Sequence, residues 1–164
     1  MKVWIDVISG DEMVSDSYKH KLIMNDAALE VKAKFVTKGN DHVQIAADEE
    51  EEDNGEGETV INVVDAHNLQ ETTLSKKDFM AIIKGYLKKV EAHLKENGKE
   101  DRVPGFKAGA TELVKFVVGK FDEFQFFCGS SFNTEAGMGF AYTADGEMDP
   151  TFLFFNDGMK EEKF

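Results

Sequence analysis

Residues 76–96 carry the pattern that most constrains the fold of this chain, because apolar side chains recur there at spacings of three and four. That period places them on one face of an α-helix. The apolar series consists of Phe79, Ile82, Ile83, Tyr86, Leu87, Val90 and Leu94. Ser75 precedes the series with Asp78 three residues later, which resembles a capping box, and Asn97-Gly98 supplies a left-handed stop. We therefore predict a helix over 76–96.

A second helix is predicted over 106–120, where apolar residues again share one side, and the pair forms an antiparallel helical hairpin at 75–120. Strand patterns surround this hairpin. Alternating or β-branched runs predict strands at 3–7, 29–37, 59–65, 124–128, 138–142 and 151–155. In the 29–37 run, alternation predicts Phe35 on the buried face. Strands, then helices, then strands again predict the α+β class in a single domain spanning 1–164.

The charge of the chain is distributed unevenly. Its net charge of −13 argues against nucleic-acid binding, because phosphate contacts need a surplus of lysine and arginine. Residues 48–58 hold eight acids and no base, whereas residues 75–120 hold eleven lysines or arginines against six acids. Like charges at such density repel, and few apolar groups remain to offset the entropy of ordering. We therefore predict a mobile acidic loop over 39–58 and a basic hairpin in an acidic molecule.

Calcium is the metal that the acidic run favours. An EF-hand needs a glycine at the sixth loop position and a bidentate glutamate at the twelfth. With Gly55 at the sixth position, Ile61 falls at the twelfth, so the run is no EF-hand. Glu50, Glu52 and Asp53 remain candidate ligands for weak calcium binding. The alternative is a solvated loop that only concentrates cations.

Four lysines of the first predicted helix share one stripe. At about 100° per residue they fall within about 40° of one another, opposite the apolar face. They are Lys77, Lys84, Lys88 and Lys95. This stripe is either the ordinary solvated back of a helix or a docking strip for an acidic partner.

The residues expected of an enzyme are missing. The histidines are not at metal-ligand spacing, and the chain has neither a phosphate-binding glycine loop nor a G-x-S-x-G elbow. The single cysteine, Cys128, follows Phe126 and Phe127, so we expect an inert buried thiol, and one thiol cannot build a zinc site of several thiolates. The N-terminus lacks the apolar core of a signal peptide, and no apolar run is long enough to span a membrane. We expect a cytoplasmic, non-enzymatic protein without a cofactor.

Several short stretches resemble the translationally controlled tumour proteins. They follow in order along the whole chain: Ile8-Ser9, Asp11-Glu12-Met13, Ser15-Asp16, Tyr18-Lys19, Leu69-Gln70-Glu71-Thr72, Tyr86, Gln125-Phe126-Phe127-Cys128-Gly129 and Phe154-Phe155-Asn156-Asp157-Gly158. The resemblance implies a β-rich, tent-like body similar to Rab exchange factors and to methionine sulfoxide reductase B. It also implies a projecting antiparallel helical hairpin and a disordered acidic loop. Those two related groups carry zinc on cysteine pairs, which this chain lacks.

The same resemblance implies a function. It points to a calcium-binding, microtubule-associated protein with anti-apoptotic and growth-promoting scaffold roles, and to a secreted pool that needs no signal peptide. The alternative is an exchange factor or stabiliser of a Ras-type small GTPase, acting through an acid that matches Glu12. Asp11 and Asp16 flank that residue, and such carboxylates could compete for the magnesium or the phosphate-binding lysine of a GTPase. The other interpretation of Glu12 is an ordinary turn acid. We expect a monomer with tubulin, calcium and a small GTPase as its candidate partners.

Overall fold

The computed structural model describes residues 1–38 and 58–163, and in this part of the chain eleven strands form three antiparallel sheets. The strands are β1 (Lys2–Asp6), β2 (Glu12–Ser15), β3 (His20–Ile23), β4 (Ala28–Lys32), β5 (Phe35–Lys38), β6 (Glu58–Ile61), β7 (Gln70–Thr72), β8 (Gln125–Cys128), β9 (Met138–Tyr142), β10 (Thr151–Phe155) and β11 (Met159–Lys163). One sheet has the order β11-β1-β2, a second the order β3-β4-β10-β9-β8-β7, and β5 pairs with β6 in a two-stranded ribbon. The predicted acidic loop lies outside the described residues except for Glu58, which opens β6.

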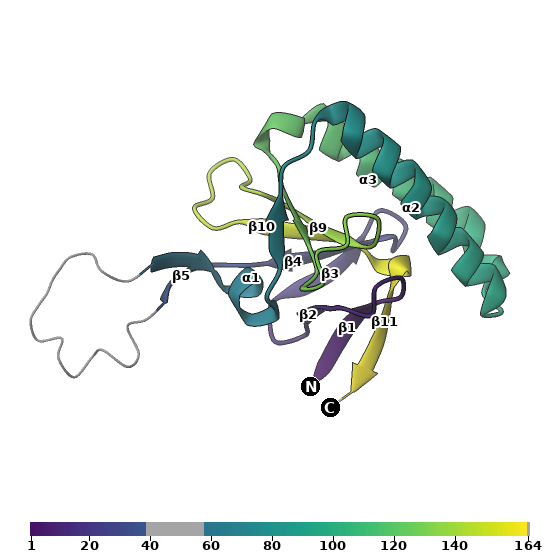
Figure 1. Cartoon of the computed structure of the whole chain (residues 1–164), viewed down its shortest axis with the longest axis horizontal. Coiled ribbons are helices and arrows are strands. Elements are labelled where there is room, and N and C mark those ends of the chain that lie inside the picture. The colour runs from purple at the N-terminus through teal and green to yellow at the C-terminus, as the bar shows by residue number, and fades with distance from the viewer. Residues whose placement is uncertain (39–57, 164) are drawn as a thin grey trace, which may run out of the picture.

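The helices are α1 (Asn62–His67), α2 (Lys76–Glu96) and α3 (Val103–Gly119). Three short 3-10 turns accompany them: η3 (Glu100–Arg102) between α2 and α3, η4 (Phe121–Glu123) after α3, and η5 (Asn156–Gly158) between β10 and β11. The helix predicted over 76–96 is confirmed, and its cap is as expected, with the Ser75 hydroxyl accepting from the Asp78 amide at 3.0 Å. The second helix begins three residues earlier than predicted, because Pro104 stands in its first turn, where a missing N–H costs nothing. The α+β class and the antiparallel hairpin are thereby confirmed (Figure 1).

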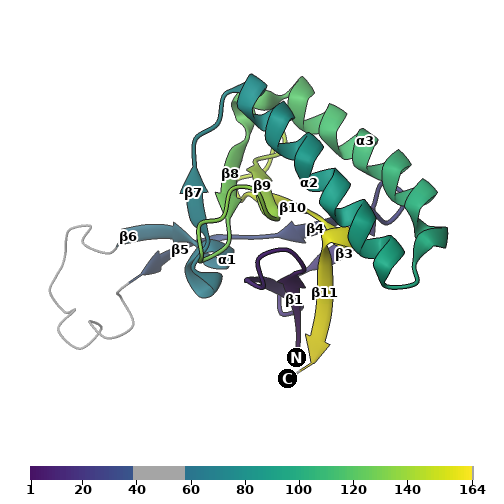
Figure 2. The ribbon, with the colours of Figure 1, turned by 45° about the vertical axis from the view of Figure 1, so that its right-hand side comes forward.

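The central strands of the six-stranded sheet are buried on both faces. In β10 all five residues are buried, with Phe152 and Phe154 on one face and Leu153 and Phe155 on the other. The hairpin covers the second of these faces, where Phe79 packs among the rings of the sheet (Figure 2). Burial on both faces explains the phenylalanine-rich C-terminal sequence, since a strand of that kind needs no polar side.

The opposite face of the six-stranded sheet meets the rest of the body. Trp4, Met13 and Val14 from the three-stranded sheet and Val63 from α1 pack there in a second apolar cluster. The two ends of the described chain lie side by side because β1 pairs with β11 (Figure 1). Among the described residues, no helix combines the length and apolarity needed to cross a membrane.

The strand predicted over 59–65 is wrong in its second half. β6 ends at Ile61, and α1 follows at once. The Asn62 side chain explains the switch, because its Oδ1 accepts the backbone N–H of Val63 at 2.8 Å and that of Lys34 at 3.0 Å. The helix then buries Val63 and ends at Asn68 in the left-handed conformation that asparagine tolerates.

The single strand predicted over 29–37 is two strands. β4 ends at Lys32, the Ala33 N–H bonds to the Pro150 carbonyl, and β5 then leaves the main sheet to pair with β6. Phe35, predicted on the buried face, is 49% exposed for this reason. Apolar and polar residues continue to alternate through the break. β5 has left the main sheet, however, so Phe35 does not meet the surface that buries the first half of the run.

Candidate functional site

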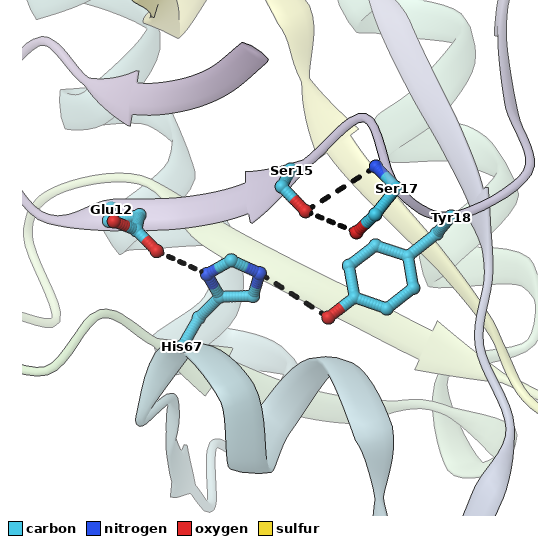
Figure 3. Close-up of polar contacts among 5 residues, drawn as sticks. All are labelled: Glu12, Ser15, Ser17, Tyr18 and His67. Atoms are coloured by element: carbon cyan, nitrogen blue, oxygen red, sulfur yellow. Dashed lines mark hydrogen bonds and ion pairs between the residues drawn. The ribbon is translucent and has the colours of Figure 1, made fainter. Parts of the chain in front are cut away.

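Glu12 and His67 form a polar contact between the three-stranded sheet and α1. The Nδ1 atom of His67 lies 2.7 Å from Oε2 of Glu12. Glu12 opens β2 and its side chain is 48% exposed, whereas the His67 side chain is only 5% exposed. A surface carboxylate is therefore held from the inside of the molecule by a buried imidazole (Figure 3).

Tyr18 extends this contact on the other side of the imidazole. Its hydroxyl lies 3.5 Å from Nε2 of His67, and the two rings meet edge to face with centroids 6.0 Å apart. Burial raises the pKa of Tyr18, and the charge of Glu12 adds to the effect. The phenol therefore stays protonated and can donate to a neutral imidazole. Figure 3 shows the chain Tyr18–His67–Glu12 running from the loop after β2, through the end of α1, back to the start of β2.

A tight turn fixes the position of Tyr18. The hydroxyls of Ser15 and Ser17 are 2.6 Å apart, and the Ser17 amide also points at the Ser15 hydroxyl. Asp16 closes the turn against β1 by accepting the N–H of Lys2 at 3.1 Å. Asp16 thus supports a loop, and this contact gives it a local structural role.

The other predicted partner-contact acid, Asp11, also holds a loop. Its Oδ2 accepts both the amide and the hydroxyl of Ser131, at 3.2 Å and 2.6 Å. Gly129 leaves room for it, since an added Cβ there would come within 2.5 Å of the Asp11 Cβ. The interpretation of Glu12 as a turn acid is wrong, because Glu12 lies in a strand and pairs with a histidine. Of the three acids, Glu12 is the most open to solvent.

No pattern in the sequence indicated that His67 belongs to this site. It stands 55 residues from Glu12, and no regular spacing connects the two. The signal nearest to it is the Asn68 that follows, a residue suited to ending a helix. A histidine in the last turn of a predicted helix would have drawn attention, but the β-branched run before it favoured a strand.

The four lysines of the predicted stripe project from the solvent side of α2. All of them are exposed, and we call them the lysine face: Lys77, Lys84, Lys88 and Lys95. The opposite side of the helix buries Phe79, Ile83, Tyr86, Val90 and Leu94. In the part of the chain that the structure describes, Lys77, Lys84 and Lys88 form no ion pair, so their charges are available to a partner.

Lys95 differs from the other three, because it is paired within the hairpin. Its Nζ lies 3.1 Å from Oε2 of Glu91, and Lys107 of α3 lies 3.4 Å from the other oxygen of the same carboxylate. The hydrogen bond from Lys95, followed by that from Lys107 and the charges of both, lowers the pKa of Glu91. Glu91 thus offsets part of the positive charge at this end of the lysine face.

Catalytic and metal chemistry finds little support in the described residues. Cys128 is fully buried, burial raises the pKa of its thiol, and its Sγ lies 3.5 Å from the Gln70 carbonyl, as expected of an inert cysteine. Within residues 1–38 and 58–163, no group of three or more histidine, cysteine or acidic side chains could hold a metal ion. The candidate calcium ligands Glu50, Glu52 and Asp53 lie outside the described residues.

The chain matches known proteins along its whole length. A family model described as translationally controlled tumour protein matches residues 1–160. The translationally-controlled tumor protein homolog 1 of Dictyostelium discoideum is 41% identical over 175 residues, and the homolog of Plasmodium berghei is 39% identical over 172 residues. Both alignments cover all of this chain and all of the relative.

Solved structures agree with the sequence matches. The translationally controlled tumor-associated protein p23fyp from Schizosaccharomyces pombe is similar to this fold with a TM-score of 0.83 at 36% identity, and the alignment covers both chains fully. The translationally-controlled tumor protein from Caenorhabditis elegans gives a TM-score of 0.70 at 25% identity, with 100% of this chain and 99% of that chain covered. The likeness therefore includes the body and the hairpin together.

Proposed function

The chain belongs to the translationally controlled tumour protein family, and on this premise we propose that it binds tubulin through the lysine face and binds calcium weakly. The observation that carries the tubulin proposal is the arrangement of charge on α2. Three exposed lysines without an ion pair among the described residues line one side of a helix whose other side is buried. The tails of tubulin are acidic and exposed, so their charge complements this surface.

The charge distribution of the whole chain supports the same proposal. The net charge is −13, so general attraction between this protein and an acidic partner is unfavourable. Binding to tubulin therefore needs a local basic surface, and the hairpin is the segment with a positive surplus. At 0.1 M salt, the attraction between exposed charges is largely lost beyond about 10 Å. This distance shortens as the salt concentration rises, so binding should weaken.

Co-sedimentation with microtubules tests this proposal. The test variant replaces the lysine face, Lys77, Lys84, Lys88 and Lys95, with glutamates. The control variant makes the same change at four exposed lysines of the body: Lys19, Lys21, Lys34 and Lys163. Both variants acquire the same net charge, so only the position of the change differs. We expect the test variant to lose co-sedimentation and the control to keep most of it, and equal losses in both would contradict the proposal.

The calcium part of the proposal rests on the acidic run, with Glu50, Glu52 and Asp53 as candidate ligands. Ligands on a surface without an EF-hand are expected to bind calcium at about sub-millimolar to millimolar strength. Titration calorimetry with calcium should show a small heat of binding for the wild type. The heat should be smaller for a variant that combines Glu50→Gln, Glu52→Gln and Asp53→Asn. A stoichiometric sub-micromolar site would contradict it.

We propose as a second candidate function that Glu12 contacts a Ras-type small GTPase and that this contact promotes nucleotide release or stabilises the GTPase. The observation in favour is that Glu12 is about half exposed while its Oε2 is anchored to His67. A carboxylate at the protein surface can compete for the magnesium ion or the phosphate-binding lysine of a GTPase. Release of a fluorescent GDP analogue from a panel of Ras-type GTPases tests the idea. Glu12→Gln keeps the shape of the side chain and should remove any acceleration, and no acceleration by the wild type would exclude the exchange role.

A further inference from the structure

We infer that His67 is a positioning residue for Glu12, which it holds with one carboxylate oxygen bound and the other available to a lysine or arginine of a protein partner. This inference rests on the second candidate function, because it concerns how Glu12 is presented. Its structural basis is the 2.7 Å contact between His67 Nδ1 and Glu12 Oε2. The two residues come from elements that are far apart in the chain, α1 and β2, so the contact fixes the carboxylate relative to the fold.

The two side chains differ in their exposure to solvent, and this difference indicates which of them holds the other in place. The His67 side chain is 5% exposed and that of Glu12 is 48% exposed. The imidazole is therefore the fixed member, and its ring points at the Glu12 carboxylate from α1 (Figure 3), while about half of the Glu12 side chain stays exposed to solvent. A partner cation can approach Glu12 while the contact with His67 stays in place.

Tyr18 completes the positioning chain. A neutral imidazole with its proton on Nδ1 donates to Glu12 and leaves Nε2 free to accept the Tyr18 hydroxyl 3.5 Å away. Both ring nitrogens then have partners, and the ring is held in one orientation. Since Ser15 and Ser17 fix the turn that carries Tyr18, each member of the chain is supported by the next.

Positioning of this kind strengthens binding because it reduces the conformational freedom that Glu12 must lose. A free glutamate side chain populates several rotamers. A partner that binds only one of them must offset the loss of this side-chain conformational entropy. A side chain already held in one rotamer avoids most of this loss. We expect removal of the His67 contact to weaken a partner's contact with Glu12 by about five- to tenfold.

Three variants separate positioning from general support of the fold. His67→Leu fills the space at the end of α1 with an apolar side chain that cannot donate a hydrogen bond. His67→Gln keeps a flexible side chain with an N–H donor, so it is the conservative variant. Tyr18→Phe leaves His67 in place and removes only the hydroxyl, which guards against a His67 variant that disturbs α1.

The first readout is the χ1 rotamer distribution of Glu12, measured by NMR scalar couplings in the full chain. We expect one dominant rotamer in the wild type and in His67→Gln, averaging in His67→Leu, and an intermediate result in Tyr18→Phe. An equally ordered Glu12 in His67→Leu and Tyr18→Phe would overturn the inference. This readout requires no partner, so it decides the positioning role on its own.

The second readout is release of a fluorescent GDP analogue from a Ras-type GTPase over a range of concentrations of this protein. His67→Leu should raise the half-maximal concentration about five- to tenfold and leave the maximal rate largely intact. His67→Gln should restore most of the loss, whereas failure of rescue alongside an ordered Glu12 would overturn the role of His67 in binding. If Glu12→Gln behaves as the wild type in this assay while the rotamer result holds, the GTPase function falls and the positioning role stands.

Discussion

The guanidinium of Arg102 binds the carboxylate of Asp157 through two parallel hydrogen bonds, Nε to Oδ1 at 2.7 Å and Nη2 to Oδ2 at 3.0 Å. This pair joins the turn between α2 and α3 to the 3-10 turn η5 of the body. The same Nη2 donates to the Asn25 carbonyl at 2.7 Å. Hydrogen bonding to Asp157 raises the pKa of Arg102, which stays charged. The basic hairpin is thus anchored at its turn as well as along its apolar face.

Removal of Arg102 should therefore destabilise the protein. The Asp157 side chain is only 7% exposed, so Arg102→Gln leaves a nearly buried carboxylate without its cation. We expect a loss of about 2 kcal/mol in the free energy of unfolding. Urea denaturation measures it, with Lys107→Gln as the control, because Lys107 belongs to a surface ion pair that is expected to contribute little. Equal losses in the two variants would show that the pair contributes no more than a surface ion pair.

Two glycines in the hairpin should respond in opposite ways to alanine. A Cβ at Gly109 of α3 would collide with the Met24 carbonyl and come within 2.5 Å of the Ala27 Cβ, whereas one at Gly85 of α2 would meet nothing within 4 Å. Gly109→Ala should cost about 1–3 kcal/mol, because the backbone of the β3–β4 turn must move. Gly85→Ala should stabilise by about 0.5–1 kcal/mol, since alanine is the better helix former. Thermal unfolding of both decides this, and a stable Gly109→Ala would mean that α3 packs less closely than described.

Stability should fall at alkaline pH in a way that depends on Tyr86. Burial raises the pKa of this tyrosine well above its usual value, and the charges of Asp6 and Asp157 add to the effect. The unfolded chain loses the phenolic proton at about pH 10, while the folded chain holds it to higher pH. The stabilisation is therefore complete below about pH 10 and is lost as pH rises further, by up to about 1.4 kcal/mol per pH unit.

Tyr86→Phe removes this titration, so its free energy of unfolding should fall less steeply above about pH 10. Tyr142→Phe is the matched control, because burial also raises the pKa of that tyrosine but its side chain is only half-buried. Urea denaturation at several alkaline pH values gives the slopes. An unchanged slope in Tyr86→Phe would contradict the assignment.

The hairpin could be predicted from the sequence because its signals are local. The apolar period of 76–96 and the Ser75 cap determine a helix without help from distant residues, and the structure confirms both. The same holds for the strands predicted at 124–128, 138–142 and 151–155, whose bounds differ from the prediction by one residue at most, whereas the largely exposed β11 was not predicted. Local patterns also placed the lysine face on the solvent side of α2, since it lies opposite the apolar face.

The errors arose where distant contacts decide the local structure. The β-branched run at 62–65 favours a strand, but α1 begins at Asn62, whose Oδ1 accepts the backbone N–H of Lys34, 28 residues away. β7 has three residues and β3 has mostly exposed ones, so neither carries a buried alternation that could be read. The Glu12–His67 contact joins residues 55 apart and left no pattern at all. Glu12 could be identified from the sequence, whereas its partner His67 became evident only from the structure.

The most direct test of the central claim compares intact microtubules with microtubules whose acidic tails have been removed by limited proteolysis. If the lysine face binds those tails, the wild type should co-sediment with intact microtubules at low salt and lose most of this binding when the tails are removed. The variant with glutamates at Lys77, Lys84, Lys88 and Lys95 should bind weakly to both preparations, with no further loss on trimming. Wild-type binding that is unchanged by removal of the tails, or a charge-reversed variant that binds intact microtubules as well as the wild type, would contradict the account.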